Sequence, residues 1–439
     1  IPVAWVLGGI GVVFAGIGYL ADTYFDTITG LDYLTLGLVV NRLWKIMDNW
    51  ILVALPMFIF MGIMLDKSGV AERLMQSMQE LFGRVRGGLA ITVTAIGIIL
   101  AASTGIIGAS VVLLAVMSLP SMTKQGYAMP LALGTIASAG TLGILIPPSI
   151  MLVIMADQLG LSVGDLFMGA VIPGLMLGAF YIVYILITGF VKPDAAPIPP
   201  DAKPITMGVF LNVMKAVLPT LALIFVVLGS IFAGIATPTE ASGVGAFGAT
   251  LLAMYNRKFS FKVLKEVVGG TMNTTAYIFA IFIGATCFAL VLRELGGDEL
   301  IESFLTGLPF GPYGIIFFIL GVIFLLGFFL DWIEITLIIL PLLAPVISAL
   351  GLDINGYGVV DNPELVWFVM LVAMALQTSF LTPPVGFALF YLKGVCPPTV
   401  KLFDIYKGVI PFIILQLVGL LILVYWPQLV LWLPATAYG

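Results

Sequence analysis

Two short motifs decide the fold of this chain: Gly143-Ile144-Leu145-Ile146-Pro147-Pro148-Ser149 and Ser379-Phe380-Leu381-Thr382-Pro383-Pro384-Val385. Each places two adjacent prolines inside a long apolar run. Two prolines remove two backbone donors and prevent an α-helix from continuing. Each motif therefore predicts a helix that breaks in apolar surroundings. We expect the carbonyls of Gly143, Ile144, Ser379 and Phe380 to lose their helical partners there.

The composition around these motifs indicates an integral membrane protein. Of 439 residues, 61% are hydrophobic and 9% are charged, whereas a soluble chain usually carries about 25% charged residues. A soluble core cannot cover this much apolar surface, so most of the chain must face lipid. The net charge of −5 argues against nucleic-acid binding, and the absence of histidine removes histidine-based metal sites and general bases.

Several apolar runs have the length of a transmembrane helix, about 20 residues. They are 2–20, 50–65, 127–156, 166–190, 208–234, 238–255, 273–292, 365–392 and 408–433. The run 3–20 lacks a basic leader and a cleavage site, so we expect a first membrane helix there rather than a signal peptide. Shorter segments that mix charged and apolar residues are expected at the membrane surface, namely 30–48, 70–84, 258–270 and 296–307.

Two further apolar stretches, 88–119 and 310–350, are too long for one helix each. Ala102-Ser103-Thr104-Gly105 interrupts the first, and Asp331-Trp332-Ile333-Glu334 interrupts the second. Each stretch therefore predicts two short helices that enter the membrane and turn back. Irregular backbone at membrane depth is tolerated only where protein or a water-filled cavity covers it.

The distribution of basic residues supports this arrangement. With a cytoplasmic amino terminus and two re-entrant hairpins, only Arg42, Lys45 and Arg293 fall outside the cytoplasmic side, which leaves 15 of the 18 basic residues on it. An excess of Lys and Arg marks the cytoplasmic side of membrane proteins. In the same arrangement the two hairpins enter the membrane from opposite sides.

The two halves of the chain repeat one order of elements: a surface segment, a re-entrant hairpin and a Pro-Pro motif. This order with opposite sides of entrance is typical of transporters built from an inverted-topology repeat. We therefore predict an all-α polytopic membrane protein with two re-entrant hairpins and broken helices. The predicted divisions are an N-terminal helix and surface arm helix of a scaffold (1–50), the first repeat (51–190), a loop (191–207), further scaffold helices and an arm (208–272), and the second repeat (273–439).

The broken helices are the candidate binding sites. Free carbonyls and hydroxyls would form an oxygen-rich cage that suits a hard cation such as Na⁺. At the tip of the first hairpin, Ser103, Thr104 and Ser110 offer oxygens among small residues. The half-helix that starts there would direct its positive end at an anionic substrate. The structural alternative to a binding site at this tip is close helix packing, which also favours small residues.

Asp331 and Glu334 are the only acids inside the second hairpin, and their spacing puts them on one helix face. Acids at membrane depth are functional candidates. Asp331 is a candidate helix cap, cation ligand or proton carrier. No basic residue falls at the predicted midplane, so a carboxylate would be held by helix ends, hydroxyls and Na⁺. Elsewhere, Glu240 in Thr237-Pro238-Thr239-Glu240 fits an ordinary helix start.

These motifs also resemble a known family. The run from Gly134 to Ser149, the Thr104-Gly105 to Ser110 hairpin, Thr237-Pro238-Thr239-Glu240-Ala241 and Leu381-Thr382-Pro383-Pro384-Val385-Gly386 are similar to the large membrane subunit of tripartite ATP-independent periplasmic (TRAP) transporters. The resemblance implies an elevator-type secondary carrier, not an enzyme, in a bacterial or archaeal inner membrane. It further implies Na⁺-driven import of a small organic acid. The expected partners are a periplasmic substrate-binding protein and a separate small four-helix membrane subunit.

The resemblance also implies positions for the sites. One Na⁺ site would use Gly327, Ser379, Thr382 and Val385. The repeat-related Na⁺ site would use Ser103, Thr104, Gly140, Thr141, Gly143 and Ile146, several of them through carbonyls. The expected substrate contacts are Ser103, Thr104, Ser110, Thr141, Asp331 and Thr336. The chain departs from the family at Ser379, where many members have glycine, and at Glu334, which adds an acid.

Three other functions remain as alternatives. A stand-alone Na⁺- or H⁺-coupled dicarboxylate symporter of similar inverted-repeat fold would need no binding protein. An intramembrane hydrolase would need a nucleophile with its base, or a pair of catalytic aspartates. Asp331 has no second aspartate at the midplane to pair with, and the chain has no histidine. A channel would give single-channel currents instead of saturable uptake.

Overall fold

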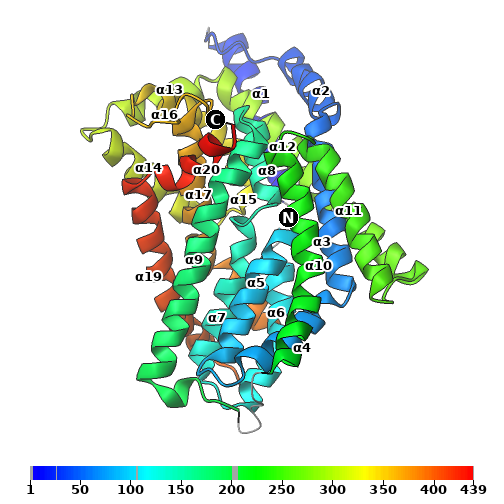
Figure 1. Cartoon of the computed structure of the whole chain (residues 1–439). Helices are drawn as coiled ribbons and strands as arrows, with labels where there is room; N and C mark the ends of the chain where they lie inside the picture. Colours follow the sequence, from blue (N-terminus) through cyan, green and yellow to red (C-terminus); the bar gives the residue numbers. More distant parts are fainter. Residues whose placement is uncertain (1–2, 26, 105–106, 200–205, 439) are drawn as a thin grey trace.

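The computed structural model describes residues 3–25, 27–104, 107–199 and 206–438, which form an elongated bundle of helices (Figure 1). Within those ranges the regular structure is α-helix with short 3₁₀ and π segments, and there is no strand. Nine of the described helices are long and apolar enough to cross a membrane. The predicted all-α polytopic class is therefore confirmed.

The helices of the first half run as far as the central loop. They are α1 (Val3–Tyr24), α2 (Tyr33–Met47), η1 (Trp50–Val53), α3 (Ala54–Lys67), α4 (Val70–Phe82), α5 (Gly88–Thr104), α6 (Ile107–Lys124), α7 (Met129–Thr141), η2 (Leu142–Ile144), α8 (Ile150–Leu159), α9 (Val163–Val191) and η3 (Pro193–Ala195).

The second half follows the loop. Its helices are α10 (Met207–Phe232), α11 (Pro238–Tyr255), α12 (Phe261–Glu294), α13 (Gly297–Thr306), α14 (Pro312–Leu326), α15 (Trp332–Glu334), the π segment η4 (Ile335–Ile339), α16 (Leu340–Ala349), α17 (Pro363–Leu381), α18 (Phe387–Val395), α19 (Leu402–Tyr425) and α20 (Gln428–Tyr438). At the start of α11, Thr237 and Glu240 form a reciprocal capping box, which confirms the predicted helix start.

The stretch 88–119 forms the predicted hairpin, in which α5 and α6 pack against each other. The base of the hairpin is closed by the backbone N–H of Leu89, which donates to the hydroxyl of Tyr127 at 3.2 Å. The backbone N–H of Ala128 donates to the carbonyl of Ala195, so the base also contacts the loop between the halves. This base lies near α4, at the end of the bundle opposite α2 and α13 (Figure 1).

The stretch 310–350 also turns back, but its two arms are built differently. α14 ends at Leu326, an irregular segment follows, and the return arm starts at Trp332. The return arm and α13 pack together at the end of the bundle that carries α2 (Figure 1). The bases of the two hairpins therefore lie at opposite ends of the molecule, as the inverted repeat predicts.

The two Pro-Pro motifs break two helices in the centre of the bundle. Every residue of α17 from Leu365 to Leu381 is buried, and so is every residue of α7 from Leu131 to Thr141. Beyond the prolines, α8 packs against η4 and α16, and α18 packs against α6. Each half-helix therefore contacts the return arm of the hairpin in the other repeat, which interlocks the two halves.

Two sequence predictions about helix boundaries are wrong. Segment 258–270 is not a separate surface segment but the start of the continuous helix α12, because Ser260 caps it and no proline interrupts it. The predicted boundary at 272/273 therefore lies inside α12. The run 408–433 is not one helix either, since α19 ends at Tyr425 and α20 begins after Pro427.

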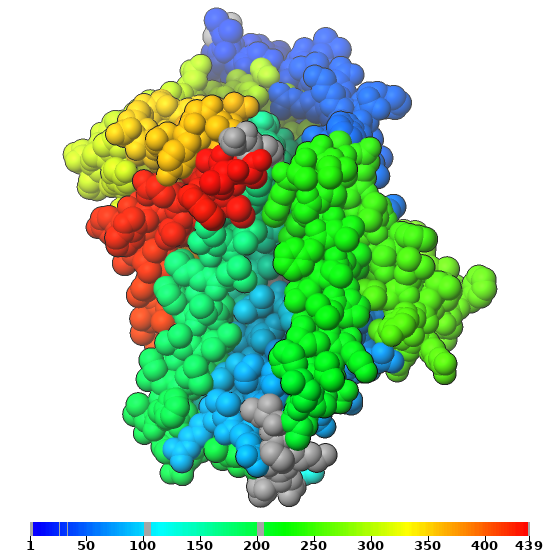
Figure 2. Space-filling model, viewed as in Figure 1, coloured from blue at the N-terminus to red at the C-terminus, as the bar shows by residue number. Residues whose placement is uncertain are grey.

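Helices of the two halves also share the outer surface. In Figure 2, α5 is visible between α9 and α10, so the first hairpin is not fully enclosed by the longer helices. α1 is the least buried of the candidate spans, with 17% of its apolar window covered by the rest of the chain. Its exposed side chains include Trp5, Val12, Val13 and Ile17. This apolar face is suited to lipid or to another membrane-embedded chain.

Candidate functional site

The break in α17 lies against the end of α14. The hydroxyl of Ser379 donates to the carbonyl of Phe324 at 2.8 Å, and the hydroxyl of Thr382 donates to the carbonyl of Thr378 at 2.7 Å. A Cβ placed on Gly327 would lie 2.6 Å from Oγ of Ser379, so only glycine allows this approach. The structure thus brings together Gly327, Ser379 and Thr382, three residues of one predicted Na⁺ site.

The break after α7 forms a second junction of the same kind. A Cβ on Gly140 would lie 2.5 Å from Cγ2 and 2.9 Å from Cα of Val111, so α6 crosses α7 at this glycine. The hydroxyl of Thr141 donates to the carbonyl of Ser138 at 2.9 Å. Gly140, Thr141, Gly143 and Ile146 are all buried here, in one short stretch of chain.

The prediction of free carbonyls upstream of the prolines is wrong for two of the four positions. The carbonyl of Ser379 accepts the backbone N–H of Thr382 at 3.0 Å. The carbonyl of Ile144 accepts the hydroxyl of Ser149 at 2.6 Å. The backbone forms a short turn at each of the two breaks, and these turns supply hydrogen-bond partners that a regular helix would not provide.

A polar cavity of about 240 Å³ lies between the two hairpins and the second broken helix. The irregular segment after α14 and the start of the return arm supply Phe329, Asp331, Trp332 and Glu334. The other described lining residues come from α1, α6, α12 and α18: Val3, Ile107, Gly108, Tyr277, Phe387 and Tyr391. Elements far apart in the sequence therefore converge on one small space.

The two acids of the second hairpin both face this cavity. Oδ1 of Asp331 accepts the backbone N–H of Trp332 at 2.8 Å, so Asp331 caps the helical return arm. Glu334 is 1% exposed, and its Oε2 has no hydrogen-bond partner among the described residues. The capping role foreseen for Asp331 is confirmed, and it does not remove Asp331 from the cavity wall.

The other predicted substrate contacts lie elsewhere or outside the described side chains. Ser110, Thr141 and Thr336 are buried but do not line the polar cavity. The hydroxyl of Thr336 donates to the carbonyl of Trp332 at 2.7 Å. The side chains of Ser103 and Thr104 are outside the described part of the chain, and only their helical backbone in α5 is described.

Sequence reasoning missed the aromatic part of the cavity. Tyr277 lies in the middle of α12 and Tyr391 lies in α18, and neither belongs to a motif. The ring of Tyr391 lies against Gly108, where a Cβ would come within 2.9 Å of it. Gly108, in the first hairpin motif, was the sequence feature that could have indicated this contact, because a glycine in a helix often marks a close approach of another element.

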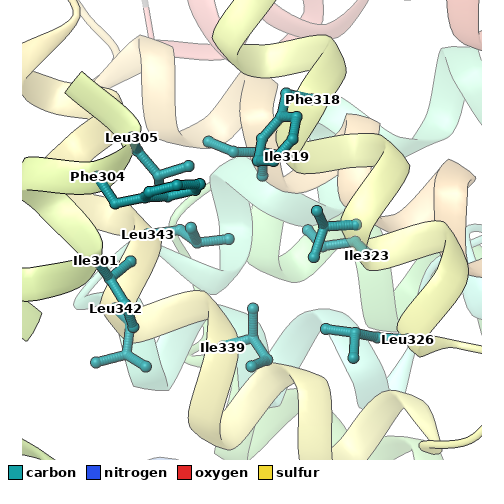
Figure 3. Close-up of a pocket in the computed structure, with 11 residues that line it drawn as sticks. Ile301, Phe304, Leu305, Phe318, Ile319, Ile323, Leu326, Ile339, Leu342 and Leu343 are labelled. Carbon is teal, nitrogen blue, oxygen red and sulfur yellow. The ribbon is translucent and has the colours of Figure 1, made fainter. Parts of the chain in front are cut away.

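A second cavity, of about 250 Å³, lies between α13, α14 and the return arm of the second hairpin (Figure 3). The side chains labelled in Figure 3, among them Phe304, Phe318 and Leu343, line it, and every described lining residue is aliphatic or phenyl. None of these described lining residues has a hydrogen-bonding side chain, so they cannot select a polar solute. The polar cavity is the candidate substrate site.

A family comparison covers almost the whole chain. The family model described as "Tripartite ATP-independent periplasmic transporter, DctM component" matches residues 1–429. The C4-dicarboxylate TRAP transporter large permease protein DctM of Pseudomonas aeruginosa is 31% identical over 394 residues, which is 90% of this chain and 88% of that protein. The sialic acid TRAP transporter large permease protein SiaM of Vibrio cholerae is 28% identical and covers 99% of this chain and 98% of its own length.

The names of further relatives mention other substrates. The ectoine TRAP transporter large permease protein TeaC of Halomonas elongata is 28% identical over 88% of this chain and 87% of its own length. Among solved structures, the YdaH transporter of Alcanivorax borkumensis has a similar fold, with a TM-score of 0.58 and 12% sequence identity. The match covers 88% of this chain and 89% of that chain.

Proposed function

This chain belongs to the family of the DctM component of tripartite ATP-independent periplasmic transporters, and we propose that it imports a small organic acid in symport with Na⁺. It is the large permease component, not an enzyme. The named relatives of this family carry C4-dicarboxylates, sialic acid or ectoine. A small organic acid is the class that these substrates share.

One observation carries the proposal of Na⁺ coupling: the contact of Gly327 with Ser379 at the second break. It places hydroxyls and backbone carbonyls from α14 and α17 within one buried junction. Oxygen donors without a formal charge suit a hard monovalent cation. Gly140 and Thr141 offer a second junction of this kind in the other repeat. We propose one Na⁺ site at each.

The polar cavity supports an elevator mechanism. Its wall combines Val3 of α1, which we assign to the scaffold, with Asp331, Gly108 and Tyr391 from the hairpins and the broken helix. In an elevator carrier, the hairpins and broken helices move with the substrate along a fixed scaffold. A cavity shared by both parts is where a substrate would lie during that movement.

We propose that two partners complete the transporter in the inner membrane. A substrate-binding protein would deliver the solute, and a small membrane subunit would extend the scaffold. In the isethionate TRAP transporter permease protein DctMQ of Oleidesulfovibrio alaskensis, this chain matches 63% of the relative's length. The remaining length of that relative leaves room for a fused additional component.

Uptake into liposomes tests the proposal. The permease and its small subunit are reconstituted, the binding protein is added outside, and radiolabelled succinate, isethionate and ectoine are offered. We expect saturable uptake of at least one solute that requires both an inward Na⁺ gradient and the binding protein. Uptake without the binding protein would favour a stand-alone symporter. Uptake that follows a proton gradient instead of Na⁺ would refute Na⁺ coupling.

A further inference from the structure

The polar cavity has an excess of negative charge. Asp331 and Glu334 line it, and none of its described lining residues is basic. Lys393, the basic residue of α18, donates from Nζ to the carbonyl of Val400 and is thereby held at the end of its helix. Two carboxylates that share one small cavity favour a counter-charge, because a buried unpaired charge such as that of Glu334 is costly.

The two carboxylates differ in their hydrogen-bond partners. Asp331 caps the helical run 332–349, and the positive end of that run opposes its charge. Glu334 is almost fully buried, and its Oε2 lacks a partner among the described residues. Buried polar atoms are nearly always paired in folded proteins. Oε2 of Glu334 is therefore a buried atom in this wall that is available to bind a ligand.

The neighbours of Glu334 suit a positively charged ligand. Tyr277, Trp332 and Tyr391 line the same cavity. The faces of aromatic rings attract cations. An acid among aromatic rings is a common way for proteins to recognise an ammonium or amidinium group, whereas a second carboxylate on the substrate would be repelled there.

Another part of the wall has the opposite polarity. Helix α6 begins at Ile107, and Ile107 and Gly108 line the cavity. The N-terminal end of a helix carries a partial positive charge and exposes free backbone N–H groups, which favour a carboxylate. The cavity is thus dipolar. Its volume of about 240 Å³ is also small, since ligand pockets usually span about 300–1,000 Å³.

We propose that the substrate is a small zwitterion, with its carboxylate toward the start of α6 and its cationic group on Glu334. This inference rests on the proposed transport function and narrows its substrate class from organic acids in general. Glu334 is then a specificity-determining residue. The competing occupant of the acidic wall is a Na⁺ ion, and the test below separates the two.

The test compares two solutes of equal chain length on the purified permease with its small subunit in NaCl. In 4-aminobutyrate a protonated aminomethyl group replaces one carboxylate of succinate. We expect 4-aminobutyrate to raise the melting temperature saturably and succinate to have no effect at the same concentration. Glu334→Gln should weaken the apparent affinity for 4-aminobutyrate at least about tenfold. The exposed control Glu302→Gln should leave that affinity unchanged.

The other outcomes separate the zwitterion proposal from the proposal of Na⁺ coupling. Stabilisation by succinate but not by 4-aminobutyrate would overturn the zwitterion proposal, and so would an unchanged response of Glu334→Gln. Loss of the Na⁺ response in Glu334→Gln would show that the acid binds Na⁺ instead. A wild-type protein that ignores Na⁺ but prefers 4-aminobutyrate would refute Na⁺ coupling and support the zwitterion. The wild-type comparison needs no variant, so it stands even if Glu334→Gln does not fold.

Discussion

The hydroxyl of Ser379 donates to the carbonyl of Phe324 at 2.8 Å, directly beside Gly327. This bond joins the broken helix of the second repeat to the helix that precedes the second hairpin's break. The two elements meet where a regular helix is impossible, because Pro383 and Pro384 follow.

Gly327→Ala should disturb the junction. The added Cβ would lie 2.6 Å from Oγ of Ser379, so Ser379 must move and its bond to Phe324 must weaken. We expect a lower melting temperature and an apparent Na⁺ affinity weakened about tenfold, equivalent to about 1.4 kcal/mol. Gly327 is the C-cap of α14, and Gly321→Ala within α14, where an added Cβ meets nothing within 4 Å, is the matched control. Equal Na⁺ responses of the two variants would contradict the assignment.

Gly140→Ala should destabilise the junction of the first repeat. Backbone atoms of Val111 lie 2.9 and 3.0 Å from the added Cβ, so trimming that side chain with Val111→Ala should not restore stability. Overpacking of this kind costs about 1–3 kcal/mol.

A contrasting pair controls for that result. In Gly178→Ala the close atoms, at 2.5 and 3.1 Å, belong only to the side chain of Ile98. Replacing Ile98 with valine removes the nearer one and should recover most of the loss. Melting temperatures of the four variants decide the matter, and rescue of Gly140→Ala by Val111→Ala would disprove the backbone contact.

A buried polar pair joins α9 to α19, where Nε2 of Gln416 donates to the hydroxyl of Tyr181 at 2.8 Å. Both side chains are fully buried. Tyr181→Phe leaves the amide without this partner and should cost about 1–3 kcal/mol. Adding Gln416→Leu should restore part of the stability, because the unpaired amide is gone. A double variant less stable than Tyr181→Phe would contradict this explanation.

The predicted orientation can be tested by labelling. In a background where Cys287 and Cys396 are replaced by alanine, Lys124→Cys lies at the end of the first hairpin and Asp353→Cys follows the second. Both positions are exposed. A membrane-impermeant thiol reagent outside intact cells should label position 353 and not position 124. Labelling of both from the same side would refute the inverted repeat.

Much of this architecture could be read from local sequence. Pro-Pro pairs, the interrupted apolar runs and the distribution of Lys and Arg depend on backbone chemistry and hydropathy, which act over short segments. The two boundary errors have local causes as well. Pro427 separates α19 from α20, although the hydropathy continues across it. Ser260 caps the start of α12, where the charged residues of 258–270 led to the prediction of a surface segment.

The substrate cavity could be predicted only in part. Asp331 and Glu334 stand out as acids in an apolar run. Tyr277 and Tyr391 do not, because a tyrosine in a membrane helix is common and its role depends on which helices pack together. Their convergence arises from the contacts of α12 and α18 with opposite hairpins. The assignment of Na⁺ and substrate to individual residues therefore stays a prediction.

The most direct test of Na⁺ coupling follows the melting temperature of the purified permease with its small subunit as KCl is replaced by NaCl at constant ionic strength. Na⁺ at ten times its dissociation constant should stabilise the protein by about 1.4 kcal/mol. Thr382→Val should weaken this saturable effect. The control is Thr378→Val, because the hydroxyl of Thr378 donates to the carbonyl of Met374 one turn back. This variant should keep the saturable Na⁺ effect. Equal melting temperatures in NaCl and KCl would contradict Na⁺ binding at the broken helices.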